Sequence, residues 1–268
     1  IVDDISKIEH RIFREALKFT EITKQIEIVS ISDVPSNCGL GTSSTFTVAL
    51  LNALFAYKRD YISIERLAEA ACHIEINVLK EPIGKQDQYA SAFGGFNAYY
   101  FEKDGKVRVE PLRIKEEMMM ELQNNLFLFY LNMNRSASSI LTDQNEKSKK
   151  NDTSTINKLH KIKEIGLYTK KVLEEGKINE FGEILHNHWL TKKSLSPKIS
   201  DPYIDEAYDI ALKNGAIGGK VVGAGGGGFL MLYCHENKTK LVEALKKYGL
   251  TPTWFSFEFE GAKKIYSA

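Results

Sequence analysis

The first residues suited to chemistry form a short run of glycines and hydroxyl side chains. This run is Gly39-Leu40-Gly41-Thr42-Ser43-Ser44. Glycine lets the backbone approach a ligand closely, because no Cβ intervenes. The exposed N–H groups and the dipole at the start of a helix attract anions. We therefore interpret the run as a phosphate cradle that opens a helix, and an ordinary capped helix start is the alternative.

Two carboxylates further along the chain supply the other groups that phosphoryl transfer needs. Asp87 lies in what we expect to be a short polar loop, and Glu75 lies in an apparent helix. Phosphoryl transfer needs an acid that orients or deprotonates the attacking hydroxyl, and a divalent cation held by oxygen ligands. Mg²⁺ keeps several waters, so one hydroxyl and one carboxylate suffice. Taken alone, Asp87 also fits a solvated turn, and Glu75 also fits the surface of a helix.

A second glycine run lies near the C-terminus, Gly223-Ala224-Gly225-Gly226-Gly227-Gly228. It formally matches the dinucleotide fingerprint G-x-G-x-x-G, but it leads into an expected strand, whereas the fingerprint opens a helix. The P-loop signature G-x-x-x-x-G-K-[ST] is not met at either glycine run. Backbone that lies against another backbone or a ligand explains the run best, and a tight hairpin is the alternative.

The hydrophobic pattern predicts the elements that position these groups. Helices are expected over 4–20, 43–57, 63–79, 156–174, 178–195, 202–214 and 238–248. Strands are expected over 26–31, 96–101, 107–109, 126–131, 220–222, 229–234 and 253–259. Asp4 and Ser63 are expected to cap two of the helices. Because strands and helices do not alternate regularly, the pattern favours an α+β fold with mixed sheets.

Composition excludes several classes of function. The chain has 268 residues, and its 36 basic and 35 acidic side chains leave a net charge of +1, so no global field attracts nucleic acid or an anionic membrane. No apolar run approaches the roughly 18 residues of a membrane span. Three widely spaced cysteines predict a reduced, cytoplasmic setting. His186 and His188 diverge on their expected helix, which favours core or surface histidines over metal ligands.

Together these stretches resemble the GHMP small-molecule kinases. The segment from Pro35 to Ser43 is similar to the family loop P-x-x-x-G-L-G-S-S, with Thr42 in place of the first serine. Lys220 to Phe229 is similar to the C-terminal glycine motif of the family. More narrowly, the chain resembles the D-glycero-D-manno-heptose 7-phosphate kinases and nearby sugar C1 kinases. The stretches that carry this narrower resemblance are Glu81 to Asn97, Asn134-Arg135-Ser136-Ala137-Ser138 and Trp189-x-x-Lys192.

The resemblance implies a two-domain α+β fold. An N-terminal ribosomal-S5-like domain is expected over 1–118 and a C-terminal ferredoxin-like domain over 119–268. The glycine run 223–228, called the glycine turn below, is expected to pack beside the phosphate cradle 39–44, called the phosphate loop below. Family members begin with a leading region that carries G-G-G-[ST]-D, and nothing similar precedes residue 4. The N-terminal domain is therefore expected to be truncated, and its sheet to present an exposed edge.

The resemblance also implies the reaction, an ATP- and Mg²⁺-dependent phosphorylation of the anomeric C1 hydroxyl of D-glycero-D-manno-heptose 7-phosphate. The partners would be ATP and a sugar phosphate, without nucleic acid or membrane, and a homodimer is left open. Two alternatives stay open: a kinase for galactose, fucose or an N-acetylhexosamine, and a non-catalytic protein of this fold that senses a sugar. A dinucleotide-binding oxidoreductase is a third and more distant alternative.

Each site residue receives a role from the resemblance. Gly39, Leu40, Gly41, Thr42, Ser43 and Ser44 would cradle the nucleotide phosphates. Ser43 and Glu75 would hold Mg²⁺, and Asp87 would be the base and contact the sugar. Arg135, Gly225 and Gly226 complete the expected substrate-binding residues.

Overall fold

The computed structural model describes residues 2–35, 38–133, 137–150 and 152–265, of which 137–139 are described by their backbone alone. The chain divides into two compact units, and each is described by itself. Unit 1 comprises Ile1–Ser36, Gly41–Asn97 and Glu258–Ala268, and unit 2 comprises Asn37–Leu40 and Ala98–Phe257. The units divide after Asn97, and the domain boundary expected after residue 118 stays a prediction.

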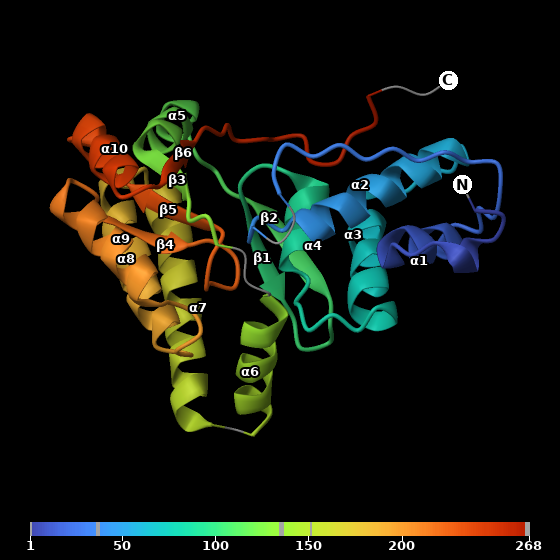
Figure 1. The fold of residues 1–268 in the computed structure, drawn as a ribbon, viewed down its shortest axis with the longest axis horizontal. Helices are drawn as coiled ribbons and strands as arrows, with labels where there is room; N and C mark the ends of the chain where they lie inside the picture. Colours follow the sequence, from blue (N-terminus) through green and yellow to red (C-terminus); the bar gives the residue numbers. More distant parts are fainter. Residues whose placement is uncertain (1, 36–37, 134–136, 151, 266–268) are drawn as a thin grey trace. The chain divides into compact units, whose positions relative to one another are not determined.

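Unit 1 is built mainly from helices (Figure 1). They are η1 (Ile5–Lys7), α1 (Arg11–Phe19), α2 (Thr42–Tyr57), α3 (Ile64–Cys72), η2 (His73–Val78) and α4 (Gln86–Phe93). Helix α3 starts at the expected cap, Ser63, whose hydroxyl accepts the N–H of Arg66. It continues directly into η2, a turn of π-helix. Helices α2, α3 and α4 pack on one another, and they bury apolar residues such as Leu51 and Ala71.

The structure corrects three expectations in unit 1. The helix expected over 4–20 is two pieces, because Asp4 caps η1 and His10 caps α1. The strand expected over 26–31 is wrong, since these residues form no strand and Ile31 is 90% exposed. A β-branched run forms a strand only where a neighbouring strand pairs with its backbone and one face is buried. Finally, Asp87 lies in the first turn of α4 and not in a loop.

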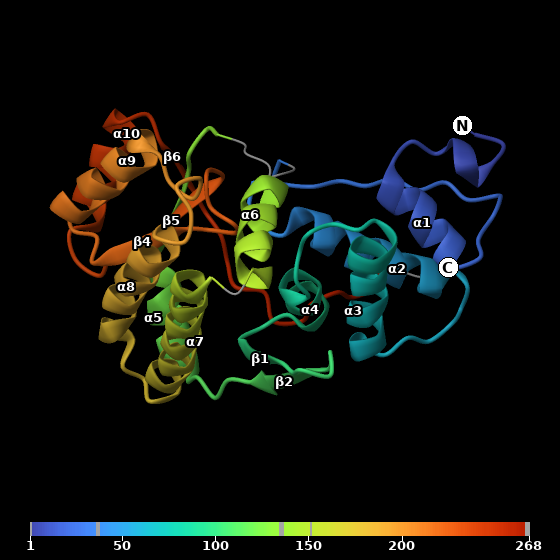
Figure 2. The same ribbon diagram turned by 90° about the horizontal axis from the view of Figure 1, so that it is seen from below.

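Unit 2 contains the strands and the remaining helices (Figures 1 and 2). The strands are β1 (Asn97–Phe101, whose first residue ends a unit 1 segment), β2 (Val107–Pro111), β3 (Leu126–Tyr130), β4 (Gly218–Val221), β5 (Phe229–Tyr233) and β6 (Thr251–Thr253). The helices are α5 (Glu116–Asn125), α6 (Ala137–Lys149), α7 (Thr153–Glu174), η3 (Ile178–Glu180), α8 (Phe181–Lys193), α9 (Pro202–Lys213) and α10 (Lys238–Lys247). β1 and β2 pair as a two-stranded sheet.

The other four strands form one sheet in the order β4-β5-β3-β6. Every neighbouring pair is antiparallel, and Phe129 of β3 lies opposite Leu230 of β5. Along the chain the order is strand, helices, two strands, helix, strand, which is the ferredoxin-like pattern. The expected ferredoxin-like fold is confirmed. The strand expected over 253–259 is wrong beyond Thr253, because β6 ends there and the exposed Trp254 follows.

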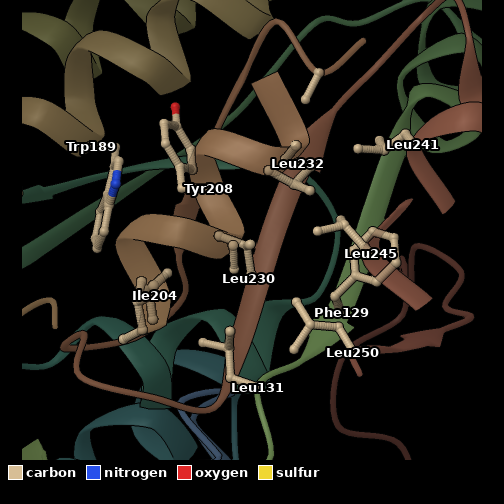
Figure 3. Close-up of a cluster of buried hydrophobic side chains, with 14 of the residues drawn as sticks. Phe129, Leu131, Trp189, Ile204, Tyr208, Leu230, Leu232, Leu241, Leu245 and Leu250 are labelled. Atoms are coloured by element: carbon tan, nitrogen blue, oxygen red, sulfur yellow. The ribbon is translucent and has the colours of Figure 1, made fainter. Parts of the chain in front are cut away.

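The core of unit 2 lies between this sheet and its helices (Figure 3). Leu230 and Leu232 of β5 are two residues apart and therefore share one face of the sheet. They pack in one cluster with residues of α9 and α10 and with Trp189 of α8, which is completely buried. Each large apolar side chain buried here contributes about 1.5–3 kcal/mol. The cluster thereby holds α8 and the strands in fixed positions. Among the described residues, no helix combines the length and apolar character needed to cross a membrane.

Candidate functional site

The N-terminus of α2 presents backbone N–H groups with no cap. Gly41 occupies the N-cap position with φ of 67°, and among the described residues no side chain caps the helix start with a hydrogen bond. The first bond within the helix runs from the N–H of Thr45 to the carbonyl of Gly41. The earlier N–H groups have no acceptor in the helix, and the helix dipole adds partial positive charge. The structure therefore favours the phosphate-cradle interpretation over an ordinary side-chain cap.

Asp87 lies directly against Gly41 at the start of α2. A Cβ added to Gly41 would be 3.1 Å from Cγ of Asp87. Only glycine allows so close an approach at this left-handed conformation. Asp87 is an exposed residue, but the protein around its carboxyl group desolvates that group and raises its pKa. A hydrogen bond from Gln86 opposes this shift only in part. A carboxylate with a raised pKa is a better proton acceptor, as a general base must be.

Glu75 is buried beside the same helix start, with 1% of its surface exposed. Oγ of Ser43 donates to Oε1 of Glu75 at 2.7 Å, and Nε2 of Gln88 donates to Oε2 at 2.6 Å. Within the described part of the chain, no cationic side chain pairs with Glu75. Burying a carboxylate is costly unless hydrogen bonds or a cation compensate. The alternative of an exposed helical Glu75 is wrong.

The Ser43–Glu75 pair fits Mg²⁺. Mg²⁺ prefers hard oxygen ligands, and Oγ of Ser43 and Oε1 of Glu75 are two such atoms held 2.7 Å apart. A cavity of about 330 Å³ opens beside the pair and is also lined by His10 and Glu81. The described residues contain no group of three or more metal-binding side chains. Water and phosphate oxygens would complete such a site, as is usual for Mg²⁺.

The glycine turn of unit 2 packs against the start of the phosphate loop. A Cβ on Gly223 would lie 2.6 Å from the carbonyl oxygen of Gly39, and one on Gly228 would collide with the carbonyl of Cys38. Gly228 also donates its N–H to the carbonyl of Met133 at 2.8 Å. The turn is therefore glycine-rich because backbone lies against backbone on several sides. This confirms the packing that the resemblance implied. The turn also closes a hairpin, because β4 and β5 pair antiparallel on either side of it.

The structure does not test the other predicted substrate-binding residues, Gly225, Gly226 and Arg135. Gly226 donates its N–H to the carbonyl of Ile199 at 2.8 Å, and a Cβ on Gly225 would approach the side chain of Ile199. Substrate contact by Gly225 and Gly226 stays a prediction. Arg135 lies outside the described residues.

Sequence reasoning missed Gln88, which holds Glu75 in place. Gln88 is buried in the first turn of α4. The signal was the apolar spacing of Tyr89, Ala92 and Phe93, which is typical of a helix face. A helix that starts at Gln86 places residues 87 and 88 in its first turn. From there Asp87 lies against Gly41 at the start of α2, and Gln88 donates a hydrogen bond to Glu75.

Comparison with known proteins decides the family. Residues 7–95 match the family model of the GHMP kinases N terminal domain, and residues 169–250 match that of GHMP kinases C terminal. Over 263 residues the chain is 34% identical to the D-glycero-alpha-D-manno-heptose 7-phosphate kinase of Campylobacter jejuni, which covers 98% of this chain and 76% of that protein. The chain belongs to the GHMP kinase family.

Solved structures of two related kinases share its fold. A D-glycero-D-manno-heptose 1-phosphate kinase from Bacteroides thetaiotaomicron has a TM-score of 0.76 at 30% identity, over 98% of this chain and 79% of its own. A putative sugar kinase from Campylobacter jejuni has a TM-score of 0.75 at 33% identity, over 97% and 74% respectively. The predicted family, α+β fold class and enzyme class are confirmed. This GHMP kinase is an ATP-dependent sugar kinase.

Proposed function

We propose that this GHMP kinase transfers the γ-phosphate of ATP to the anomeric C1 hydroxyl of D-glycero-D-manno-heptose 7-phosphate. One arrangement in unit 1 carries the proposal: the uncapped start of α2, the Ser43–Glu75 pair and Asp87 adjoin one another. These are the groups that phosphoryl transfer to a hydroxyl requires. The choice of heptose 7-phosphate is supported by the name of the Campylobacter jejuni relative.

Each residue then has a defined task. The backbone N–H groups of residues 39–44 bind the nucleotide phosphates and stabilise the charge that develops during transfer. Asp87 accepts or orients the proton of the C1 hydroxyl, whose oxygen forms a bond to the γ-phosphorus while the bond to ADP breaks. Ser43 and Glu75 would hold Mg²⁺, which supplies positive charge to the phosphates. Gln88 keeps the carboxylate of Glu75 in position through its 2.6 Å hydrogen bond.

The position that is phosphorylated is the sharpest test. The relative from Campylobacter jejuni is named for heptose 7-phosphate, and that from Bacteroides thetaiotaomicron for heptose 1-phosphate. We expect release of ADP with Mg·ATP and heptose 7-phosphate. Phosphorus NMR of the product should show a second phosphate coupled to the anomeric proton. Turnover of heptose 1-phosphate with none of heptose 7-phosphate would overturn the proposal.

Fucose is the second candidate acceptor. The chain is 25% identical to the bifunctional fucokinase/GDP-fucose pyrophosphorylase of Arabidopsis thaliana over 84% of its length, although the match spans 22% of that protein. The same ADP assay should therefore include fucose, galactose and N-acetylhexosamines. A higher kcat/KM for one of them would replace heptose 7-phosphate. Absence of ADP release with every sugar would favour a non-catalytic sensor.

We also propose the cytoplasm as the place of action. ATP, the phosphate donor, is supplied there, and all three cysteines are unpaired and buried. Cell fractionation with an antibody to the protein checks this location.

A further inference from the structure

Three basic side chains of unit 2 converge beside the glycine turn: His188, Lys192 and Lys220. His188 and Lys192 are four residues apart on α8 and therefore lie on the same face of this helix. Lys220 belongs to β4, which runs alongside α8. These three residues are called the basic cluster below.

The register between α8 and β4 explains why Lys220 joins the other two. A Cβ on Gly218 would lie 2.8 Å from His186, so this side of β4 faces α8. Lys220 follows two residues later, and its side chain leaves the strand on the same side. At the far end, Nζ of Lys192 donates to the carbonyls of Val221, at 3.4 Å, and Gly223. Lys220 thus faces the part of α8 between positions 186 and 192.

The basic cluster has no acidic partner. In the described part of the structure, Lys220 makes no hydrogen bond or ion pair, and no carboxylate pairs with Lys192. Nδ1 of His188 is buried without a hydrogen-bond partner. Burial lowers the pKa of Lys220, and burial together with the neighbouring Lys220 lowers the pKa of Lys192 to about 7 and that of His188 to about 3. Basic groups buried without a carboxylate partner are costly, and groups with such shifted pKa values are enriched at functional sites.

We propose that the basic cluster of unit 2 is a binding site for a phosphate monoester, the group that the proposed sugar substrate carries. The proposal rests on the proposed function, in which the acceptor is already a phosphate monoester. Such a group brings up to two negative charges and three acceptor oxygens, which suits three convergent donors. The nucleotide phosphates have their own N–H groups at the start of α2, whereas the carboxylates of unit 1 would repel a second phosphate.

Kinetics of Lys220→Met test the proposal directly, because the side chain of Lys220 makes no hydrogen bond or ion pair with any described residue. We expect KM for heptose 7-phosphate to rise about tenfold or more and KM for ATP to stay constant, since a charge-assisted hydrogen bond in a partly buried site has this magnitude. Lys240→Met is the matched control, because Lys240 is an exposed lysine of α10 in the same unit. It should change neither constant. Without ligand, Lys220→Met should melt no lower than the wild type, because an unpaired buried charge is removed.

A second measurement is independent of catalysis. The ring signals of His188 are followed by NMR during titration with inorganic phosphate, and they are assigned by their loss in His188→Gln. Phosphate should shift these signals in the wild type and in Lys240→Met. The midpoint of this titration should move to about tenfold higher phosphate in Lys220→Met.

The outcomes separate this proposal from the proposed function. If heptose 7-phosphate is turned over and Lys220→Met leaves its KM unchanged, the phosphate site is wrong and the proposed function stands. If KM for ATP rises instead, the basic cluster serves the nucleotide and the proposal falls. If heptose 7-phosphate is not turned over at all, the proposed function fails and the His188 titration decides: unmoved signals overturn the site, and saturable, Lys220-dependent shifts support it.

Discussion

Asp87 is defined as a candidate base by its neighbours. Its carboxyl group lies against Gly41, and the protein around it raises its pKa above the usual value. Glu75, which lies in η2, is held by hydrogen bonds from Ser43 and Gln88. We therefore propose different tasks for two acids of the same chemical type: Asp87 would accept the proton of the sugar hydroxyl, and Glu75 would offer a fixed ligand oxygen.

Asp87→Asn should lower kcat by about a hundredfold or more, which is the usual contribution of a general base. In the wild type, kcat should fall as pH falls through the raised pKa of Asp87, because the protonated carboxyl group accepts no proton. This limb should lie at higher pH than the ordinary value of 3.8 for aspartate. Steady-state rates across pH measure both effects.

The control for this substitution is stability. A raised pKa means that the folded protein disfavours the ionised carboxylate, so the neutral amide should melt at the same temperature or higher at neutral pH. ATP affinity should be retained. A near-normal rate in Asp87→Asn would remove Asp87 from the mechanism.

Ser43→Ala should weaken binding of Mg·ATP about tenfold, because one oxygen ligand and the partner of Glu75 are lost together. Binding of the sugar phosphate should change much less. Calorimetric titration of each ligand measures the two affinities. Ser91→Ala is the matched control, because its hydroxyl contacts Thr45 and not Glu75. Equal losses for both ligands would contradict the metal assignment of Ser43.

At the level of elements, irregular turns do the positioning. The π-turn η2 follows α3 directly and carries the buried Glu75, and π-turns are frequent at functional sites. The glycine turn between β4 and β5 fits against Cys38 and Gly39 because Gly223 and Gly228 have no side chains. Both features combine a local departure from regular structure with a close approach to the phosphate loop.

Gly223→Ala should disturb the phosphate loop. Its Cβ would lie 2.6 Å from the carbonyl oxygen of Gly39, so either the loop or the turn must move. We expect weaker ATP binding and a free energy of unfolding lower by about 1–3 kcal/mol. Gly105→Ala is the matched control, because Gly105 also has positive φ but nothing lies within 4 Å of its Cβ. Chemical denaturation and ATP titration compare the two variants, and identical behaviour would show that the contact with Gly39 has no effect.

At the level of the whole molecule, the ferredoxin-like core of unit 2 supports the glycine turn and the basic cluster. The glycine turn connects β4 and β5 of its sheet, and α8 carries two of the three basic residues. The completely buried leucines and aromatic residues therefore hold the glycine turn and the basic cluster in place. The loss of such a residue should act on stability first.

Leu232→Ala should lower the free energy of unfolding by about 2–5 kcal/mol, because Leu232 is 0% exposed and a cavity would remain. Leu167→Ala on α7 is the matched control. Leu167 is 51% exposed, so its change should stay within about 0.5 kcal/mol. Urea denaturation measures both changes in the free energy of unfolding. A small effect in Leu232→Ala would mean that the buried apolar cluster around Leu232 is not the core of unit 2.

The residue types and their spacing were enough to predict much of this protein. Glycines followed by hydroxyl residues indicated the phosphate loop and the helix after it, and the pattern around residues 126–131 and 229–234 indicated two buried strands. These features are local: propensity, periodicity and backbone freedom act over a few neighbouring residues. Even so, the β-branched run at 26–31 predicted a strand that does not form, because pairing depends on residues elsewhere.

What only the tertiary structure decided is which distant residues meet. Ser43 and Glu75 are 32 positions apart, yet their oxygens lie 2.7 Å apart. Gly223 meets Gly39, and Lys220 of β4 joins His188 and Lys192 of α8. No local signal in the sequence encodes such pairs, because the packing of helices and the register of strands set these distances. The sequence by itself therefore determined the kinds of chemical group present, and the packing of α2, α3 and α4, and of α8 on β4, decided which of them act together.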